Sequence, residues 1–88
     1  MEQPRIILYG HASCPGTQAA QAYFATRGVA YAYRDIGTDP AARAELRAMG
    51  EMATPVVLVG DRRLLGFDLG EFERLCRRAR EAKDGWTS

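Results

Sequence analysis

The sequence has few of the residues on which many small proteins depend for stability or metal binding. Of its 88 residues, two are cysteine, one is histidine and one is tryptophan. Cys14 and Cys76 are too few for a framework of disulfides, and their spacing does not match a zinc site. We therefore expect neither a disulfide scaffold nor a metal site, and the fold must depend on a hydrophobic core.

An excess of charge and long apolar runs are also lacking. Lys and Arg number 12 against 11 Asp and Glu, so the net charge is +1. Such a balance gives no strong electrostatic attraction for nucleic acid or an anionic membrane. No apolar run approaches the roughly 20 residues of a membrane-spanning helix, and residues 1–5 do not resemble the start of a secretory signal. We therefore expect a cytoplasmic protein that binds neither nucleic acid nor membrane.

What is present is enough apolar material for one small domain. Hydrophobic residues make up 47% of the chain, and its length is that of a single domain. There is no internal repeat and no segment with the composition of a linker. We therefore predict one domain over residues 1–88.

Hydrophobic patterning predicts the element order β-α-β-α-β-β-α. Four short apolar runs predict strands at 5–9, 29–36, 54–60 and 64–67. A turn is predicted at 61–63, between the last two of these strands. Three segments that start with a proline or a capping residue predict helices: 15–27, 40–49 and a last helix after a capping box of Asp68 and Glu71.

This order predicts an α/β fold. A β-α-β start has a right-handed crossover and two parallel strands, and a tight connection after Gly60 makes the last two strands antiparallel. We therefore predict a four-stranded mixed sheet with helices on both faces. In the last helix Phe72 and Cys76 share one apolar face, so we expect Cys76 to pack in the core.

The stretch HASCPGTQ (11–18) places a cysteine where the first predicted strand gives way to a helix. Pro15 suits the first helical position, which makes Cys14 the N-cap. Unpaired backbone N–H groups and the helix dipole favour negative charge there, and the thiolate is the form of cysteine that attacks disulfides. His11 from upstream and the Thr17 hydroxyl from one turn inside the helix add to this effect. We predict that Cys14 is a nucleophile.

Each of these residues also has a plainer explanation. Cysteine is often a small buried hydrophobe, but a loop that follows a strand of an α/β sheet is exposed and is where such folds place their chemistry. This position favours a reactive Cys14. His11 is otherwise a solvated loop side chain, and Thr17 is otherwise a tolerated residue of the first helical turn.

Three motifs resemble the glutaredoxin family of the thioredoxin fold, and especially its NrdH-type redoxins, which supply electrons to ribonucleotide reductase. The motifs are ILYGHASCPGT, ATPVVLVG and LLGFD, in the family's order and spacing. The resemblance covers about Ile6 to Leu75. It implies a thioredoxin-like fold and thiol–disulfide oxidoreductase activity.

The resemblance also implies roles for residues far from the cysteine. Pro55 would be cis, and the backbone of Thr54 would pair with the peptide part of a bound thiol or substrate. Gly66, Phe67 and Asp68 would border the cleft, where the free N–H groups of the last helix suit a carboxylate of a small thiol such as glutathione. Without the resemblance, Thr54-Pro55 is a plain entry into a strand and Asp68 is only a helix cap.

The chain departs from the family after the reactive cysteine. Dithiol members have Cys-Pro-aromatic-Cys, and this chain has Gly16 and Thr17 at the last two positions. Members that carry iron–sulfur clusters have Cys-Gly-Phe-Ser, and Pro15 and Gly16 break that pattern. Glu51 stands where the family often places a positive or polar group.

These features predict a monothiol glutaredoxin-like oxidoreductase that acts through Cys14. Cys14 takes a small thiol from a protein mixed disulfide, and a second small-thiol molecule releases it. We expect a monomer with no tightly bound cofactor, whose partners are a small thiol such as glutathione and protein mixed disulfides. One alternative is a non-catalytic redox-sensing or binding module with the same fold, and a less favoured one is an iron–sulfur carrier.

Overall fold

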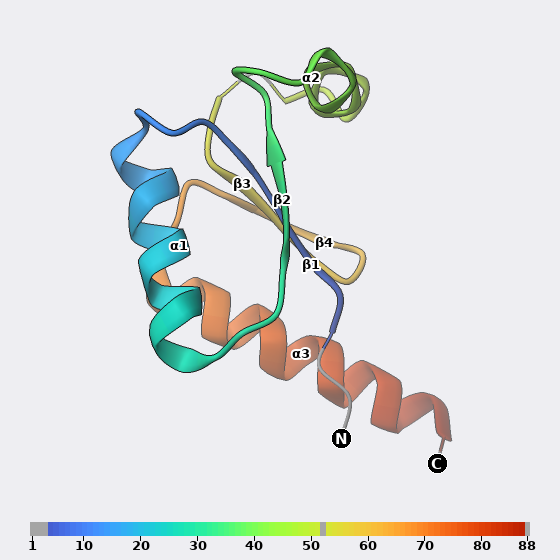
Figure 1. The fold of residues 1–88 in the computed structure, drawn as a ribbon. Helices are drawn as coiled ribbons and strands as arrows, with labels where there is room; N and C mark the ends of the chain where they lie inside the picture. The colour runs from blue at the N-terminus through green and yellow to red at the C-terminus, as the bar shows by residue number, and fades with distance from the viewer. Residues whose placement is uncertain (1–3, 52, 88) are drawn as a thin grey trace.

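Three helices cover a four-stranded sheet in this protein (Figure 1). The computed structural model describes residues 4–51 and 53–87, with the backbone alone over 80–87. The elements follow in the predicted order: β1 (Ile6–Gly10), α1 (Pro15–Arg27), β2 (Ala32–Asp35), α2 (Pro40–Ala48), β3 (Val56–Val59), β4 (Arg62–Leu65) and α3 (Leu69–Thr87).

The sheet is mixed and has the strand order β2-β1-β3-β4. β1 pairs in parallel with β2, because α1 carries the chain back between them, and β3 runs antiparallel to both β1 and β4. β1 is therefore central, and the loop that follows it lies at the edge of the sheet where β2 also ends. The predicted fold class is confirmed.

The predicted boundary between the last two strands is wrong. Arg62 and Arg63 were expected in a turn, but they pair with Val59 and Leu58 and begin β4, which ends at Leu65. Gly60 has a φ of 62°. This left-handed conformation allows a hairpin turn of two residues, so the strand starts two residues earlier than predicted.

The predicted strand 29–36 is longer than β2, which spans Ala32–Asp35. Gly28 closes α1 in the left-handed conformation, and the N–H of Val29 donates to the carbonyl of Phe24 at 2.8 Å. Val29 therefore belongs to the helix cap rather than to the sheet.

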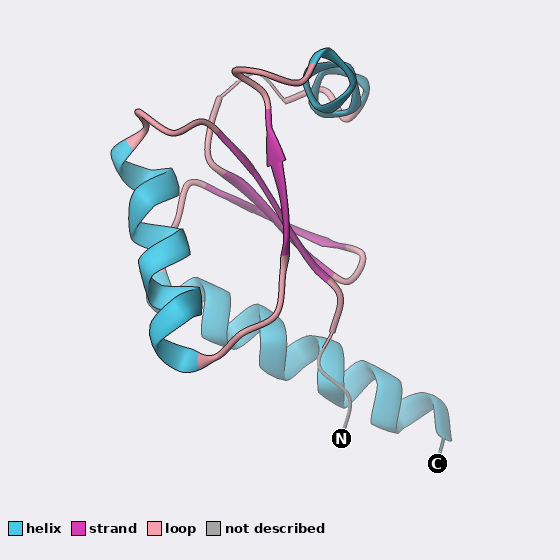
Figure 2. Ribbon diagram, viewed as in Figure 1, coloured by secondary structure: helices cyan, strands magenta, loops and turns pink. Residues whose placement is uncertain are grey.

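Alternation along the central strands directs side chains to both faces of the sheet. The helices α1 and α3 lie on one face of the sheet and α2 lies on the other (Figure 2). On the first face the core includes Phe24, which is fully buried, and on the second Leu46 of α2 packs with Tyr9 and Val56. Cys76 is half-buried and packs against the first of these clusters, as predicted.

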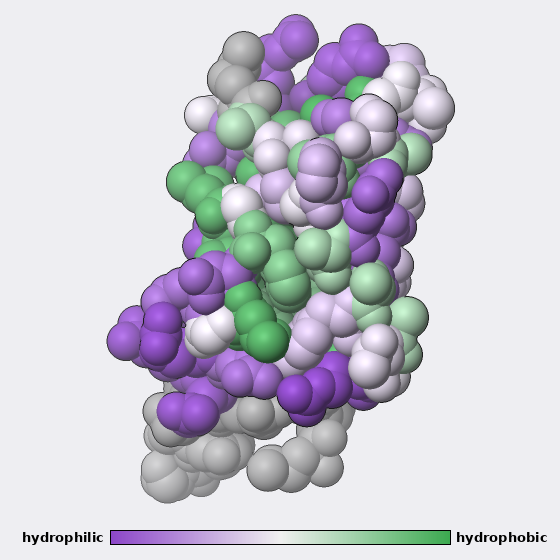
Figure 3. Space-filling view, turned by 90° about the vertical axis from the view of Figure 1, so that its left-hand side faces the viewer, coloured by the Kyte–Doolittle hydropathy of each residue, from purple (hydrophilic) through white to green (hydrophobic). Residues whose placement is uncertain are grey.

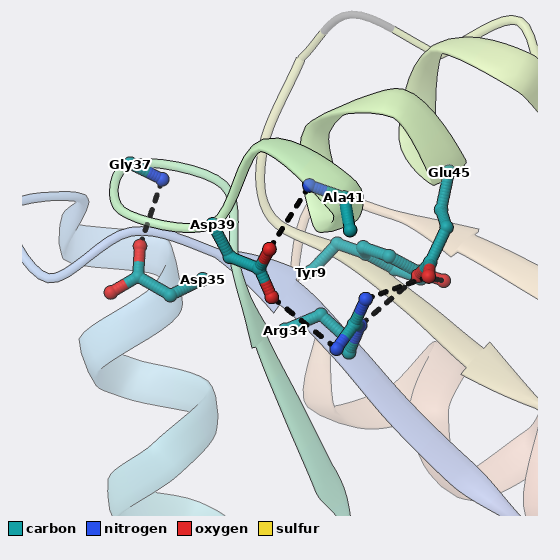
Figure 4. A network of polar contacts seen from close by, with 7 residues as sticks. All are labelled: Tyr9, Arg34, Asp35, Gly37, Asp39, Ala41 and Glu45. Carbon is teal, nitrogen blue, oxygen red and sulfur yellow. Dashed lines mark hydrogen bonds and ion pairs between the residues drawn. The ribbon is translucent and has the colours of Figure 1, made fainter.

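A polar network joins α2 to the strands beneath it (Figure 4). Glu45 of α2 accepts hydrogen bonds from the Tyr9 hydroxyl at 3.0 Å and from Arg34 at 2.6 and 3.0 Å. Arg34 also lies 3.5 Å from Asp39, whose carboxylate caps α2 by accepting from Ala41 N at 3.0 Å. The network therefore links β1, β2 and both the start and the middle of α2.

The face of the molecule on the α1 side has an apolar area in its middle, with hydrophilic side chains around it (Figure 3). Leu65 and Leu69 are the large apolar side chains of the described residues that are exposed, at 61% and 44%. Within the described part of the chain, no helix combines the length and the apolar character that crossing a bilayer requires.

Candidate active site

Hydrogen bonds within the loop after β1 hold Cys14 in place. The N–H of Cys14 donates to the His11 carbonyl at 3.1 Å, and the side-chain amide of Gln18 donates to the Ala12 carbonyl at 2.7 Å. The imidazole Nδ1 of His11 lies 2.9 Å from the Ser13 hydroxyl. The contact that the structure gives this imidazole is therefore with Ser13 and not with the sulfur.

Cys14 is the N-cap of α1, as predicted. Its backbone is extended, with φ −82° and ψ 120°, while its carbonyl already accepts from Gln18 N at 3.0 Å. Pro15 occupies the first helical position, where no N–H is needed. The next two N–H groups, of Gly16 and Thr17, have no acceptor inside the helix and are available to the sulfur.

Hydrogen-bond donors around Cys14 lower the pKa of its thiol from the ordinary value of 9.0. The largest cause is the Thr17 hydroxyl, followed by the Thr17 N–H; partial burial opposes them, and the Thr54 hydroxyl and the Gly16 N–H act in the same direction as Thr17. The Thr54 hydroxyl and carbonyl oxygens each lie 3.8 Å from Sγ. Because donors stabilise negative charge, the arrangement favours the thiolate.

Thr17 is completely buried. Its hydroxyl has no hydrogen-bond partner among the described residues. It can therefore donate to the charged sulfur of Cys14, which agrees with its lowering of the Cys14 pKa. Position 17, where dithiol members have their second cysteine, therefore carries a hydroxyl and not a thiol.

The loop before β3 forms the opposite wall of the site. The Thr54–Pro55 peptide bond is cis, as the resemblance implies, and Pro55 is buried. A Cβ built on Gly16 would lie 2.8 Å from Pro55 Cδ and 3.9 Å from Cys14 Sγ. The fold therefore brings Thr54 and Pro55 against the first turn of α1, about 40 residues away in the sequence.

The turn after β4 is attached to this wall. The N–H of Gly66 donates to the carbonyl of the cis proline at 2.8 Å. Phe67 is half-buried, and its ring packs 5.8 Å from that of Phe24, so it extends the aromatic core. Asp68 accepts from the N–H of Glu71 at 3.0 Å and so caps α3, as predicted.

Glu51 is held in an ion pair beside this loop. Its carboxylate lies 2.7 Å from Arg63 of β4, and the same guanidinium group donates to the Met49 carbonyl at 3.0 Å. The negative charge of Glu51, which departs from the positive or polar group of the family pattern, is therefore partly balanced by Arg63. Among the described residues there is no group of three or more His, Cys, Asp or Glu side chains arranged to hold a metal ion.

Two residues of the site, Gly10 and Gly16, were missed in the sequence. Neither has a positive φ, so neither needs to be glycine for its backbone conformation. Each instead allows a close approach, by Thr17 in one case and by Pro55 in the other. The available signal was a glycine at a strand end and another in a first helical turn, where glycine is unfavourable without such a reason.

Comparisons with known proteins agree with this geometry. The glutaredoxin family model matches residues 6–64, a range that contains Cys14 and the cis proline. No curated protein matches the chain.

Several solved structures are similar to this chain. The NrdH-redoxin of Escherichia coli, described as a glutaredoxin-like protein, is 31% identical, and the match covers 81% of this chain and 93% of that one with a TM-score of 0.71. The thioredoxin-like protein BC3987 is 26% identical over 81% of this chain and 99% of its own, with a TM-score of 0.73. The glutaredoxin of Archaeoglobus fulgidus, at 21% identity, covers 84% of this chain and 87% of its own with a TM-score of 0.71, and shares the fold.

The family model spans the chain from β1 into β4, and the structural neighbours share the arrangement of sheet and helices. Both findings support a glutaredoxin-like redox function. The chain has the thioredoxin-like α/β fold and belongs to the glutaredoxin family.

Proposed function

We propose that this protein is a monothiol thiol–disulfide oxidoreductase that works through Cys14 alone. The observation that carries the proposal is the set of donors from Gly16, Thr17 and Thr54 that act on the sulfur, together with a threonine at the position of a second cysteine. The donors prepare Cys14 to attack a disulfide. The second cysteine of the chain, Cys76, packs against the core from α3, so the second reacting sulfur comes from another molecule.

The proposed cycle has two exchange steps. In the first, the Cys14 thiolate attacks the small-thiol sulfur of a protein mixed disulfide; the new disulfide forms on Cys14, and the protein leaves as a thiolate that takes a proton from water. In the second, the thiolate of a free small thiol attacks the small-thiol sulfur on Cys14. The small-molecule disulfide leaves, and Cys14 is again a thiolate. The net reaction converts one mixed disulfide and one small thiol into one protein thiol and one small-molecule disulfide.

The geometry also supports a binding mode for the small thiol. The Thr54 carbonyl oxygen lies 3.8 Å from Sγ, which supports pairing of this backbone with the peptide part of a bound thiol. The turn at Gly66 and the capped start of α3 at Asp68 are attached to the same wall through the cis proline. Asp68 takes the N–H of Glu71, and the other N–H groups of a helix start suit a carboxylate. We therefore propose glutathione, or a small thiol with a similar carboxylate, as co-substrate.

The test is turnover of a glutathionylated protein with glutathione, followed through the formation of glutathione disulfide. We expect turnover by the unmodified chain, ping-pong kinetics and complete loss of turnover in Cys14→Ser. Cys76→Ser is the matched control, because it removes the other thiol, and it should retain the activity.

Turnover that survives in Cys14→Ser contradicts the proposal. So does a lack of turnover by the unmodified protein with glutathione, cysteine and cysteamine in turn. That second result favours a redox-sensing or binding module.

A further inference from the structure

Gly10, the last residue of β1, has no backbone reason to be glycine. It pairs in register with Asp35 of β2, and its carbonyl accepts from the N–H of Ile36 at 2.9 Å. Its φ is not positive. Since glycine weakens a strand, a strand residue of ordinary geometry usually carries a side chain, and the reason for its absence must lie in a neighbour.

The neighbour is Thr17. A Cβ built on Gly10 would lie 2.2 Å from Thr17 Oγ1, 2.7 Å from Cγ2 and 3.0 Å from Cβ. Because Thr17 is 0% exposed, its side chain has no solvent into which to turn. A single methyl group on Gly10 would therefore displace the side chain of Thr17 and with it the hydroxyl.

The Thr17 hydroxyl has no partner among the described residues. A buried hydroxyl without a hydrogen bond is costly, so its presence calls for an acceptor that forms at some stage of the protein's work. Thr17 is the third residue of α1, and a side chain at that position reaches back toward the N-cap residue. The N-cap residue is Cys14.

We propose that Gly10 is a positioning residue for the Cys14 thiolate, because its missing side chain lets Thr17 place its hydroxyl where the charged sulfur accepts it. The inference rests on the proposed function of Cys14. With a neutral thiol, or a small thiol bound to Cys14, the hydroxyl lacks a full hydrogen bond; with the thiolate, it has one. The same hydroxyl therefore favours ionisation of Cys14 and makes Cys14 a better leaving group when the second small thiol attacks.

Besides Thr17, the Gly16 N–H from α1 and the Thr54 hydroxyl from the cis-proline loop act on the sulfur. Tyr33 of β2 is linked to Cys14 through charge. Burial first, and then nearby groups that include Cys14, raise the pKa of the Tyr33 phenol, so it stays uncharged while Cys14 ionises. His11 lies on the same loop and contacts Ser13.

The test is the pKa of the Cys14 thiol in the full chain, measured by ultraviolet absorbance of the thiolate with Cys14→Ser as the blank that accounts for Cys76. Gly10→Ala and Thr17→Val should each raise this pKa by about one pH unit, because each removes the same donor to a charged group. Their combination should raise it no further than Thr17→Val alone. Thr17→Ser keeps the hydroxyl and should restore the value of the unmodified protein.

Ile6→Val is the matched control, because it removes one methyl group at the opposite end of the same strand, and it should leave the pKa of Cys14 unchanged. A folded Gly10→Ala protein with an unchanged pKa overturns the proposal. If Gly10→Ala does not fold, Thr17→Val provides the test, because valine keeps the shape of the threonine side chain. An unchanged Cys14 pKa in Thr17→Val also overturns the proposal. The titration needs no turnover, so loss of the proposed catalytic function would be seen separately, in the turnover assay of the unmodified protein.

Discussion

Replacing a thiol with a hydroxyl at position 17 changes what the first turn of α1 does for Cys14. A second thiol at this position would form a disulfide with Cys14 and end the reaction inside the protein. A hydroxyl forms no such bond. In the proposed cycle it donates a hydrogen bond to the sulfur at each stage at which the sulfur is charged. Thr17 therefore favours the thiolate of Cys14, and under the proposed mechanism an outside thiol releases the small thiol from it.

The lowered pKa of Cys14 predicts how its alkylation depends on pH. Because only the thiolate reacts with iodoacetamide, the rate falls about tenfold per pH unit below the pKa and is level above it. Mass spectrometry of the Cys14 peptide should place the midpoint below the ordinary value of 9.0. The ionised form is favoured in the fold, so its contribution to stability is complete above 9.0 and is lost as the pH falls through the lowered pKa. A midpoint at or above 9.0 contradicts the assigned geometry.

The residues of the site differ in how far the sequence alone predicts them. Cys14 and Pro15 lie in one local pattern, a strand end followed by a helix start, which is readable in a single stretch. Pro55 depends on the family resemblance, because nothing local distinguishes a cis proline from a strand entry. Gly10 and Gly16 could not be assigned, since the reason for each is the space left by a residue that only the fold brings near.

At the scale of elements, local sequence signals determine the bounds of α1, whereas strand pairing determines where β4 begins. Pro15 and Gly28 mark the bounds of α1, and both were predicted correctly because caps act within one turn of the chain. The start of β4 depends on the turn that joins it to β3. A composition of Asp and Arg does not indicate whether that turn takes two residues or three, and the left-handed conformation of Gly60 settles it.

Apolar and ionic contacts both attach α2 to the sheet, and their contributions to the free energy of unfolding should differ in pH dependence. Arg34 first, and then Tyr9, lower the pKa of the Glu45 carboxyl from its ordinary value of 4.5. The stabilisation from the pair is therefore present above pH 4.5 and is lost as the pH falls through the lowered pKa. Glu45→Gln should lower the free energy of unfolding only slightly at pH 7, because the pair is exposed, and not at all near pH 2. Leu46→Ala removes a buried side chain and should cost about 2–4 kcal/mol at both values.

Urea denaturation at the two pH values measures both variants. An effect of Glu45→Gln that is equal at pH 7 and pH 2 contradicts the ionic role assigned to the network. An effect of Leu46→Ala as small as that of Glu45→Gln shows instead that α2 depends on its polar contacts more than on its apolar face.

At the scale of the whole molecule, the site depends on a core that lies away from it. The walls around Cys14 come from the start of α1 and from the loop before β3, and the positions of both follow from packing on the central strands. Phe24, near the far end of α1, lies at the centre of the larger cluster. Its ring is 4.8 Å from that of Tyr31 and 5.1 Å from that of Phe72, so it joins α1, α3 and the segment before β2.

Removing this ring should therefore affect the chemistry at Cys14 through the fold rather than through contact. Phe24 is fully buried, and Phe24→Ala should cost about 3–5 kcal/mol, a large part of the roughly 5–15 kcal/mol that stabilises a small domain. Phe24→Leu fills most of the space and should cost less. Urea denaturation measures the loss, and iodoacetamide labelling of Cys14 in the same samples should change from the rate of the folded site to that of an ordinary thiol across the same transition. Labelling that changes well before global unfolding would show that the first turn of α1 opens independently of its aromatic end, and that the site is not supported by this core.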